Sequence, residues 1–164
     1  MSMMKRFSAV ALLCAAAAFT PATRAADAAP DFKLASAKGM VELSKLKGKV
    51  VYVDFWASWC TPCRKSFPWM NELHKKYKDQ GLEVVAVNLD KSREPIDIFL
   101  AKTPADFTIA YDPSGTAAAN YKVSGMPSSY VIDRSGQLQV SHLGFRDKDK
   151  EEIEAKIKEL LTKK

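Results

Sequence analysis

Hydrophobic and polar residues follow a pattern along this chain that predicts strands alternating with helices. The segment 50–56 (VVYVDFW) is apolar at odd and even positions alike, except at Asp54. Such a segment is typical of a strand that is covered on both faces of a sheet, so we expect it at the sheet centre. The segment 82–89 (LEVVAVNL) has the same character. Shorter apolar runs separated by turn residues predict further strands at 32–34, 41–43, 108–111, 129–133 and 137–143.

Helical patterns fill the intervals between these strands. A helix can begin at the cysteines, with Pro62 tolerated in its first turn, and continue to a stop at Gly81. The segment 148–161 carries apolar residues on one face and charged residues on the other, which predicts an amphipathic helix docked on the sheet. Two shorter helices are expected at 96–102 and 114–121. Strands alternating with helices over 164 residues predict one domain of the α/β class.

The first residues depart from this pattern. Two basic residues precede an uncharged apolar segment, 7–19, which predicts a secretory signal peptide. We expect cleavage after Ala25, or alternatively after Ala28, so that residues 26–164 form the exported domain. The apolar segment spans about 20 Å at about 1.5 Å per residue, which is shorter than a hydrocarbon core of about 30 Å and argues against a membrane anchor.

The positive charge of the chain belongs largely to this leader. The full chain has a net charge of +6, and removal of residues 1–25 takes away three basic and no acidic residues, which leaves a net charge near +3. The remaining lysines and arginines are dispersed along helical faces and are not interleaved with aromatic residues, so we do not expect nucleic-acid binding. The composition is otherwise ordinary for a globular domain and does not indicate a function.

Two cysteines remain after removal of the leader, which contains Cys14. Cys60 and Cys63 lie between a predicted strand and a predicted helix. The unpaired N–H groups and the positive end of the dipole at a helix start favour a thiolate over a thiol. We therefore interpret Cys60 as a nucleophile that forms a mixed disulfide with a substrate, and Cys63 as the thiol that resolves it.

Two other interpretations of the cysteine pair remain open. A structural disulfide usually closes a longer loop and is one of several in a small secreted domain, so one small loop fits this role poorly. A structural zinc site needs four ligands, and the histidines available to complete it, His74 and His142, lack paired ligand spacing. We expect no metal, and we interpret both histidines as surface or partly buried residues.

The residues around the cysteines resemble a known family. The sequence 53–63 (VDFWASWCTPC) resembles the active-site strand and helix start of the thioredoxin family, and Pro68 stands where that family kinks its first helix. The sequence 123–130 (VSGMPSSY) resembles its cis-proline loop. The export signal, the form WCTPC and an additional helix and strand between Lys91 and Tyr111 resemble the periplasmic branch of TlpA, ResA and DsbE type thiol-disulfide oxidoreductases. The resemblance implies a thioredoxin fold for residues 26–164, with a central mixed β-sheet flanked by helices and this insertion before the cis-proline half.

The resemblance also implies roles for single residues. Asp54 would be buried near Cys63, where desolvation raises its pKa and lets it accept the Cys63 proton; a partly exposed or hydrogen-bonded structural carboxylate is the alternative. The bond between Met126 and Pro127 would be cis, and a substrate segment would pair beside it as an added strand. Trp59 is expected to shield the solvent side of the disulfide and to contact the substrate.

Two further residues near the pair have less specific roles. Trp56 is expected to point the other way along its strand and to be a core residue. Some members of the branch have an additional acidic residue near the cysteines, after the strand that corresponds to 82–89. Asp90 stands in this region, but a strand-end turn or a helix cap is the better interpretation, so a second active-site acid remains open.

These expectations together predict a periplasmic enzyme that exchanges the Cys60/Cys63 dithiol with protein disulfides, without a cofactor and as a monomer. Reduction of the substrate is the expected direction, in cytochrome c maturation or a related assembly. Cytosolic reductants do not reach that compartment, which implies a membrane electron donor. Potentials in this fold range from about −270 mV for thioredoxin to about −120 mV for DsbA, so the direction depends on a value that the sequence does not give.

Two alternatives belong to other functional classes. A peroxiredoxin-like peroxide reductase would need a Thr-x-x-Cys nucleophile, but the residue three positions before Cys60 is Ala57. A non-enzymatic chaperone would hold a metal or a cytochrome through Cys60 and Cys63 without turnover.

Overall fold

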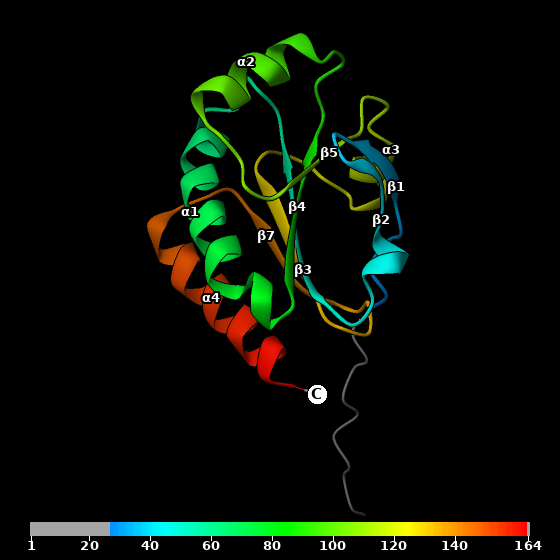
Figure 1. The fold of residues 1–164 in the computed structure, drawn as a ribbon, viewed down its shortest axis with the longest axis vertical. Coiled ribbons are helices and arrows are strands. Elements are labelled where there is room, and N and C mark those ends of the chain that lie inside the picture. Colours follow the sequence, from blue (N-terminus) through cyan, green and yellow to red (C-terminus); the bar gives the residue numbers. More distant parts are fainter. Residues whose placement is uncertain (1–26, 164) are drawn as a thin grey trace, which may run out of the picture.

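The computed structural model describes residues 27–163 of the chain. The predicted leader, Cys14 and the expected cleavage point after Ala25 lie outside the described residues. The described residues form a seven-stranded mixed sheet with helices on both faces, which confirms the predicted α/β class (Figure 1). None of the described helices is long and apolar enough to cross a membrane.

The sheet is built around two adjacent parallel strands. β3 (Val50–Trp56) pairs in parallel with β4 (Leu82–Asn88) and antiparallel with β6 (Ser128–Ile132). The strand order is β2-β1-β5-β4-β3-β6-β7, so the middle strand is β4, and β3, predicted at the centre, is the interior strand next to it. The outer strands and the inserted strand are β1 (Lys33–Ser36), β2 (Gly39–Glu42), β5 (Thr108–Tyr111) and β7 (Leu138–Leu143).

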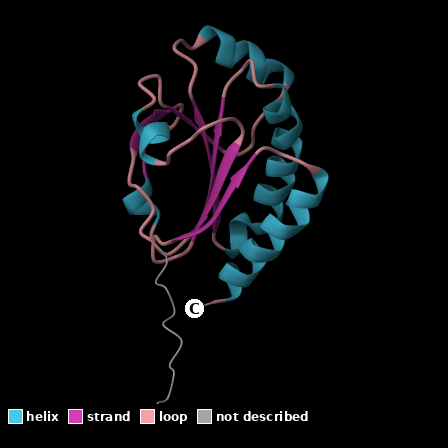
Figure 2. Cartoon of the chain, turned by 180° about the vertical axis from the view of Figure 1, so that it is seen from behind, coloured by secondary structure: helices cyan, strands magenta, loops and turns pink. Residues whose placement is uncertain are grey.

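Helices cover both faces of the sheet (Figures 1 and 2). On one face lie α1 (Thr61–Tyr77) and α4 (Asp147–Thr162), with α2 (Glu94–Lys102) at the upper end of this layer in Figure 1. The short helix α3 (Thr116–Asn120) and the 3-10 turn η1 (Leu43–Leu46) lie on the opposite face.

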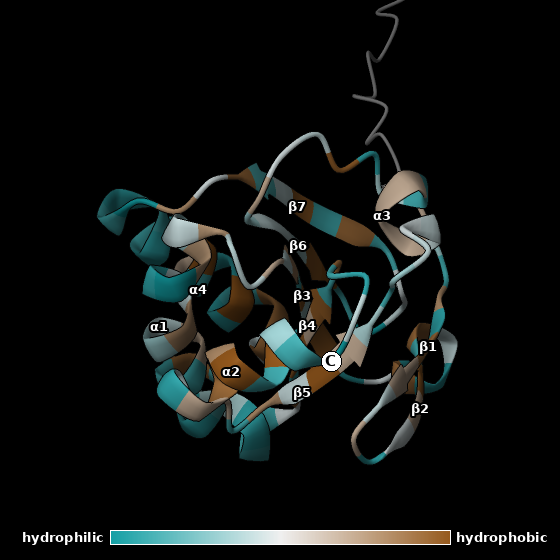
Figure 3. Cartoon of the chain, turned by 90° about the horizontal axis from the view of Figure 1, so that it is seen from above, coloured by the Kyte–Doolittle hydropathy of each residue, from teal (hydrophilic) through white to brown (hydrophobic). Residues whose placement is uncertain are grey.

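The two faces of β3 pack into separate hydrophobic clusters. Tyr52 and Trp56 belong to the cluster under α1, α2 and α4, whereas Val51 and Val53 belong to the cluster under α3. All residues of β3 are buried, which confirms the prediction from its apolar pattern. Viewed from above, the central strands lie between α1 and α4, which carry many hydrophilic residues, on one side and α3 on the other (Figure 3). Asp54 lies on the α1 side, because alternate residues of a strand share a face.

Local sequence explains where α1 begins and ends. Cys60 has extended backbone angles and caps the helix, and Pro62 occupies the first turn, where the missing N–H would have no partner in any case. The helix is followed by a 3-10 turn, η2 (Lys78–Gln80), and by Gly81. Gly81 has a φ of 100°, in the left-handed region that favours glycine, so the predicted stop at this residue is confirmed.

Some element boundaries differ from their predictions for local reasons. α3 begins two residues later than predicted, because the Asp112 carboxylate accepts hydrogen bonds from Thr116 N and Ala118 N and holds residues 112–115 as a turn. α2 begins two residues earlier than predicted, with Pro95 in its first turn. These shifts leave the order of the elements as expected.

The predicted insertion is present between β4 and α3. α2 follows β4, and β5 then enters the sheet between β4 and β1. Ile96 and Phe99 anchor α2, since they are only 1 % and 3 % exposed. The Phe99 ring lies 4.9 Å from the ring of Phe67 in α1. The insertion therefore packs α2 against the first half of α1, the helix that begins at the cysteines.

Candidate redox site

Cys60 and Cys63 form a disulfide at the start of α1, with 5.3 Å between their Cα atoms. The backbone N–H of Cys63 donates a hydrogen bond of 3.2 Å to Cys60 Sγ, so this sulfur caps the helix. The Cys60 N–H donates to the carbonyl of Ala57, which closes the preceding loop. The predicted position of the pair at a helix start is confirmed. In the reduced form, a free helix N–H at this position stabilises a thiolate.

The two cysteines differ in their access to solvent. Cys60 is 4 % exposed, whereas Cys63 is completely buried. An incoming molecule can therefore reach Cys60 before it reaches Cys63. Trp59, directly before Cys60, lies on the solvent side and is 71 % exposed. An indole so exposed is available to contact another molecule.

Asp54 is 1 % exposed and shares a face of β3 with two residues of the cluster that contains both cysteines. Burial raises its pKa well above the ordinary value, because the ionised carboxylate would lose its solvation. Its Oδ2 atom is buried and has no hydrogen-bond partner among the described residues. Burial and a raised pKa are as predicted, and a partly exposed carboxylate is excluded. The role of Asp54 as a proton acceptor stays a prediction.

Trp56 lies on the same side of the sheet as the cysteines, so the predicted opposite direction is wrong. Residues 52, 54 and 56 share one face because side chains alternate along a strand. The Trp56 ring lies 4.7 Å from the rings of Phe67 and Phe99, within the cluster that includes the cysteines. It is fully buried, so the prediction that it is a core residue is confirmed.

The segment before β6 also belongs to this part of the molecule. The peptide bond between Met126 and Pro127 is cis, as predicted. Met126 is half-buried and packs against the cluster that contains the cysteines, and Pro127 is buried. The Pro127 carbonyl accepts a hydrogen bond from Gly144 N, which ties this segment to the end of β7. Contact of Met126 and Pro127 with a substrate stays a prediction.

Asp90 supports the loop that leads to Cys60. Its carboxylate accepts hydrogen bonds from Ser58 N at 2.8 Å, from Ser58 Oγ at 2.9 Å and from Asn88 Nδ2 at 2.8 Å. The Asp90 N–H donates to Asn88 Oδ1, which forms a turn at the end of β4. The interpretation as a strand-end turn is therefore confirmed. The same carboxylate also fixes Ser58, two residues before Cys60, so Asp90 positions the redox loop.

Ser58 is not among the predicted site residues, although the sequence contains a signal for its contact with Asp90. β3 and β4 are parallel, so the residues that follow Trp56 and Asn88 leave the sheet at the same edge. A polar residue after one strand can then meet a polar residue after the other. Use of this signal requires the order of the strands, which the apolar patterns of the two segments leave undetermined.

Neither histidine joins the cysteine pair in a ligand group. His142 Nε2 is 3.0 Å from Asp149 Oδ2 at the start of α4. Hydrogen bonds from Arg146 and then from His142 lower the pKa of Asp149 to about 2. His74 is half-buried in α1. Within residues 27–163, no three Cys, His, Asp or Glu side chains gather in a group that could hold a metal ion.

Replacing Asp54 with Asn is expected to stabilise the fold at neutral pH. Below the ordinary Asp pKa of about 3.9, the carboxyl is protonated in the folded and the unfolded chain alike. Above that pH, the unfolded chain releases a proton that the folded chain retains, so the stability of the unmodified protein falls relative to Asp54→Asn until the raised pKa is passed. The difference in the free energy of unfolding, in favour of the variant, should grow to about 1.4 kcal/mol for each unit by which the pKa of Asp54 is raised. Urea unfolding of the oxidised proteins from pH 3 to pH 9 measures it.

The matched control is Asp147→Asn, at an exposed carboxyl whose pKa is lowered by its hydrogen bond with Lys150. The pH dependence of the stability has the opposite sign there. A lowered pKa stabilises the fold at pH values above the ordinary Asp pKa, and this stabilisation is lost on acidification. Asp147→Asn should therefore weaken the fold slightly at neutral pH. A stability difference for Asp54→Asn that does not change with pH would contradict the raised pKa.

Comparisons with known proteins agree with this geometry. The AhpC/TSA family model matches residues 25–141 of the chain. The thiol-disulfide oxidoreductase ResA of Bacillus cereus is 34% identical over 133 residues, which cover 80% of this chain and 76% of the relative. ResA of Bacillus subtilis is 38% identical over 111 residues, which cover 67% and 62% of the two chains.

Solved structures give the same result. A crystal structure described as a thiol:disulfide interchange protein DsbE from Chlorobium tepidum has a TM-score of 0.81 and 52% identity, covering 84% of this chain and 97% of that one. A solution structure described as a protein disulfide isomerase from Bacteroides thetaiotaomicron has a TM-score of 0.78 and 28% identity, covering 87% and 92%. The chain therefore belongs to the thioredoxin-like AhpC/TSA family, as a thiol-disulfide oxidoreductase of the ResA and DsbE type.

Proposed function

We propose that this protein is exported to the periplasm and there reduces disulfides of partner proteins through Cys60 and Cys63. The observation that carries the proposal is the combination of a reachable sulfur with an unreachable one. Cys60 caps α1 and is slightly exposed, while Cys63 lies fully buried behind it. A structural disulfide needs no such asymmetry, whereas exchange with a substrate does. The names of the related oxidoreductases support the same chemistry.

In the first step, the Cys60 thiolate attacks one sulfur of a substrate disulfide. A bond forms between Cys60 Sγ and that sulfur, the substrate S–S bond breaks, and the second substrate sulfur leaves as a thiolate. The Cys63 N–H, which lies 3.2 Å from Cys60 Sγ, stabilises the attacking thiolate. The product is a mixed disulfide between Cys60 and the substrate.

In the second step, Cys63 releases the substrate. In molecules whose Asp54 is ionised, the Cys63 thiol gives its proton to that carboxylate and its sulfur attacks Cys60 Sγ, so that the Cys60–Cys63 disulfide forms and the remaining substrate sulfur leaves. A carboxylate whose pKa is raised by burial is a stronger base than an ordinary one, which suits it to accept a proton from a thiol. In total, two electrons pass to the substrate and the dithiol is oxidised.

We assign substrate binding to Trp59, Met126 and Pro127. Trp59 offers an exposed ring beside Cys60, and Met126 is partly exposed in the segment before β6. An extended substrate segment that pairs with the backbone of Met126 would be held by main-chain hydrogen bonds, which do not depend on its sequence. Such binding suits an enzyme whose substrates are protein disulfides.

The proposal of export rests on the predicted leader. Contacts of the residues that follow the leader help to choose between its two expected cleavage points. Leu138 N donates a hydrogen bond of 2.9 Å to the Asp27 carbonyl, and Ala28 forms an antiparallel bridge with Gln137. Cleavage after Ala25 preserves both contacts, whereas cleavage after Ala28 removes them. These contacts favour the earlier cleavage point.

A periplasmic reductase needs electrons from across the membrane, because cytosolic dithiols do not reach that compartment. We therefore propose a membrane electron donor that reduces the Cys60–Cys63 disulfide after each turnover. The proposed substrates are protein disulfides in cytochrome c maturation or a related assembly. The enzyme is proposed to act as a monomer and without a cofactor.

A peroxide reductase and a non-enzymatic chaperone would each use the cysteine pair in a different way. A peroxide reductase would need a hydroxyl three positions before the nucleophile, but Ala57 is buried there and has none. A chaperone would use Cys60 and Cys63 to hold a metal or a cytochrome and would not turn over. Variants of the two cysteines separate these functions from disulfide reduction.

Cys60→Ser is expected to abolish the reduction of insulin disulfides, because the attacking sulfur is lost. Cys63→Ser is expected to accumulate mixed disulfides between Cys60 and substrate, because no second sulfur releases them. Non-reducing electrophoresis and mass spectrometry detect these adducts. A Cys63→Ser protein that traps no substrate would favour the chaperone. Rapid consumption of peroxide without reduction of insulin would favour the peroxide reductase.

Asp54→Asn is expected to slow release of the substrate more than its capture, because Asn accepts no proton from Cys63. A slowing on the order of 100-fold is expected for the second step, at the lower end of what a positioned general base contributes. Rapid quenching with acid followed by mass spectrometry measures the formation and decay of the mixed disulfide. Equal slowing of both steps would contradict the assignment.

The reduction potential of the Cys60/Cys63 pair decides the direction of exchange. For a reductase it is expected to lie nearer to about −270 mV than to about −120 mV. Equilibration in glutathione buffers, followed by alkylation of the free thiols, measures this value. A potential close to about −120 mV would make the enzyme an oxidant and leave the exchange chemistry in place.

A further inference from the structure

Large exposed hydrophobic side chains are few in the described part of the chain, and two of them share one hollow beside Cys60. Trp59 is 71 % exposed and Ile98, on α2, is 54 % exposed. They line a surface hollow of about 210 Å³ between the start of α1 and α2. The other residues that define this α2 hollow are Ser58, Arg64, Pro95, Phe99 and Lys102.

The α2 hollow has an apolar base and a positively charged rim. Phe99 is 3 % exposed and packs against the core, and the Arg64 guanidinium lies 5.3 Å from the centre of its ring. Arg64 and Lys102 are exposed, and neither forms an ion pair with another residue of the described chain. Among residues 27–163, no carboxylate lines the hollow. Asp97 of α2 lies outside this lining and is paired with Arg93.

Contacts on both sides of the α2 hollow hold it in place relative to the Cys60 sulfur. Asp90 holds Ser58 at 2.8 Å, and Ser58 precedes Trp59 and Cys60 directly. On the other side, the buried residues Ile96 and Phe99 anchor α2, so Ile98 and Lys102 are held outward. A substrate bound to Cys60 through its cysteine extends about 3.3 Å per residue, so its next residues reach Trp59 and the hollow.

We propose that the α2 hollow docks the residues that flank the reactive cysteine of a protein substrate, and that it selects an apolar side chain followed by acidic ones. This inference rests on the proposed function and names the substrate class of the same site. The apolar side chain displaces water from Trp59, Ile98 and Phe99. The acidic residues complement Arg64 and Lys102, which meet no opposite charge from the described residues that line the hollow.

Three peptide probes test the proposal, each joined through its single cysteine to thionitrobenzoate. The acidic probe carries leucine next to the cysteine and two glutamates beyond it, the basic probe has lysines in place of the glutamates, and the third has glycine at all these positions. The Cys60 thiolate attacks the peptide sulfur, and thionitrobenzoate leaves as a coloured thiolate. Rates are measured with the fully reduced protein at low salt.

The unmodified protein is expected to react about tenfold faster with the acidic probe than with the basic one, through complementary charge. Added salt should reduce this preference. Lys102→Glu is expected to abolish or reverse it. Ile98→Ser should lower the ratio of the rate with the acidic probe to the rate with the glycine probe about threefold. The reason is that the leucine of the acidic probe then removes less apolar surface from water.

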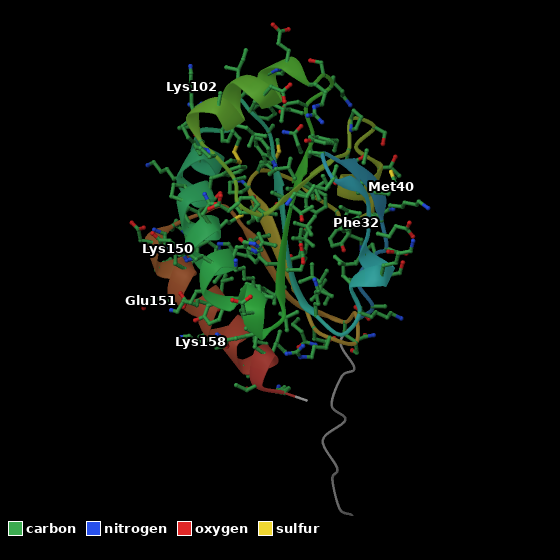
Figure 4. All side chains as sticks on the ribbon, in the orientation of Figure 1. Phe32, Met40, Lys102, Lys150, Glu151 and Lys158 are labelled. Atoms are coloured by element: carbon green, nitrogen blue, oxygen red, sulfur yellow. A yellow bond between two sulfur atoms is a disulfide. The ribbon has the colours of Figure 1, made fainter. Side chains whose placement is uncertain are left out.

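The matched control is Met40→Ser, which removes a hydrophobic side chain of similar exposure, 56 %, from the β1–β2 hairpin. Figure 4 labels Met40 and Lys102 on opposite sides of the molecule. Thermal unfolding of each variant checks that the fold is retained. Met40→Ser is expected to keep the probe ratios of the unmodified protein.

Two results would overturn the docking proposal while leaving the proposed function intact. One is cleavage of all three probes at similar rates by the unmodified protein. The other is a Lys102→Glu protein that keeps the preference for the acidic probe, or an Ile98→Ser protein that keeps the acidic-to-glycine ratio. Failure of the unmodified protein to release thionitrobenzoate from any probe would instead overturn the proposed function, and this inference with it.

Discussion

Burial of β3 on both faces is the constraint on which the rest of the structure depends. The strand must carry apolar side chains toward both layers, and the one exception, Asp54, is therefore held away from water. The same burial that stabilises the sheet raises the pKa of that carboxyl. The chain leaves β3 at Trp56 and enters α1 at Thr61, so that Cys60, at 4 % exposed, is the more accessible sulfur and Cys63 is fully buried. The packing of β3 thus accounts for the raised pKa of its one carboxyl.

Two buried carboxylates near the redox pair have opposite environments. Asp90 accepts three hydrogen bonds, two from Ser58 and one from Asn88, and so acts as a fixed brace for the loop before Cys60. Asp54 has an oxygen without any partner among the described residues. A carboxylate held by three hydrogen bonds keeps one geometry, whereas burial without a hydrogen-bond partner disfavours the ionised form and raises the pKa. The first is suited to positioning and the second to proton transfer.

The sequence predicts those features that depend on local pattern or on a contiguous motif. The buried strands, the helix start at Cys60, the stop at Gly81 and the burial of Asp54 belong to this class. The late start of α3 depends on a side chain, Asp112, that competes with the helix for backbone N–H groups, and hydrophobic periodicity does not register such competition. The contact of Asp90 with Ser58 depends on which strands are neighbours. The direction of Trp56 follows from simple alternation along β3 and was predictable.

Chemistry at sulfur is nearly the same for every protein disulfide, so selectivity among substrates must come from contacts outside the cysteine pair. In the proposed mechanism, the helix start and Asp54 act on whichever disulfide arrives, and main-chain pairing beside Met126 is indifferent to side chains. Only surfaces that present side chains next to Cys60 can discriminate. Trp59 precedes the nucleophile, and α2 is the element that adds further side chains on that flank, held in place by Ile96 and Phe99. An insertion that holds none of the residues assigned to the exchange reaction is therefore well placed to decide which cysteine is delivered to it.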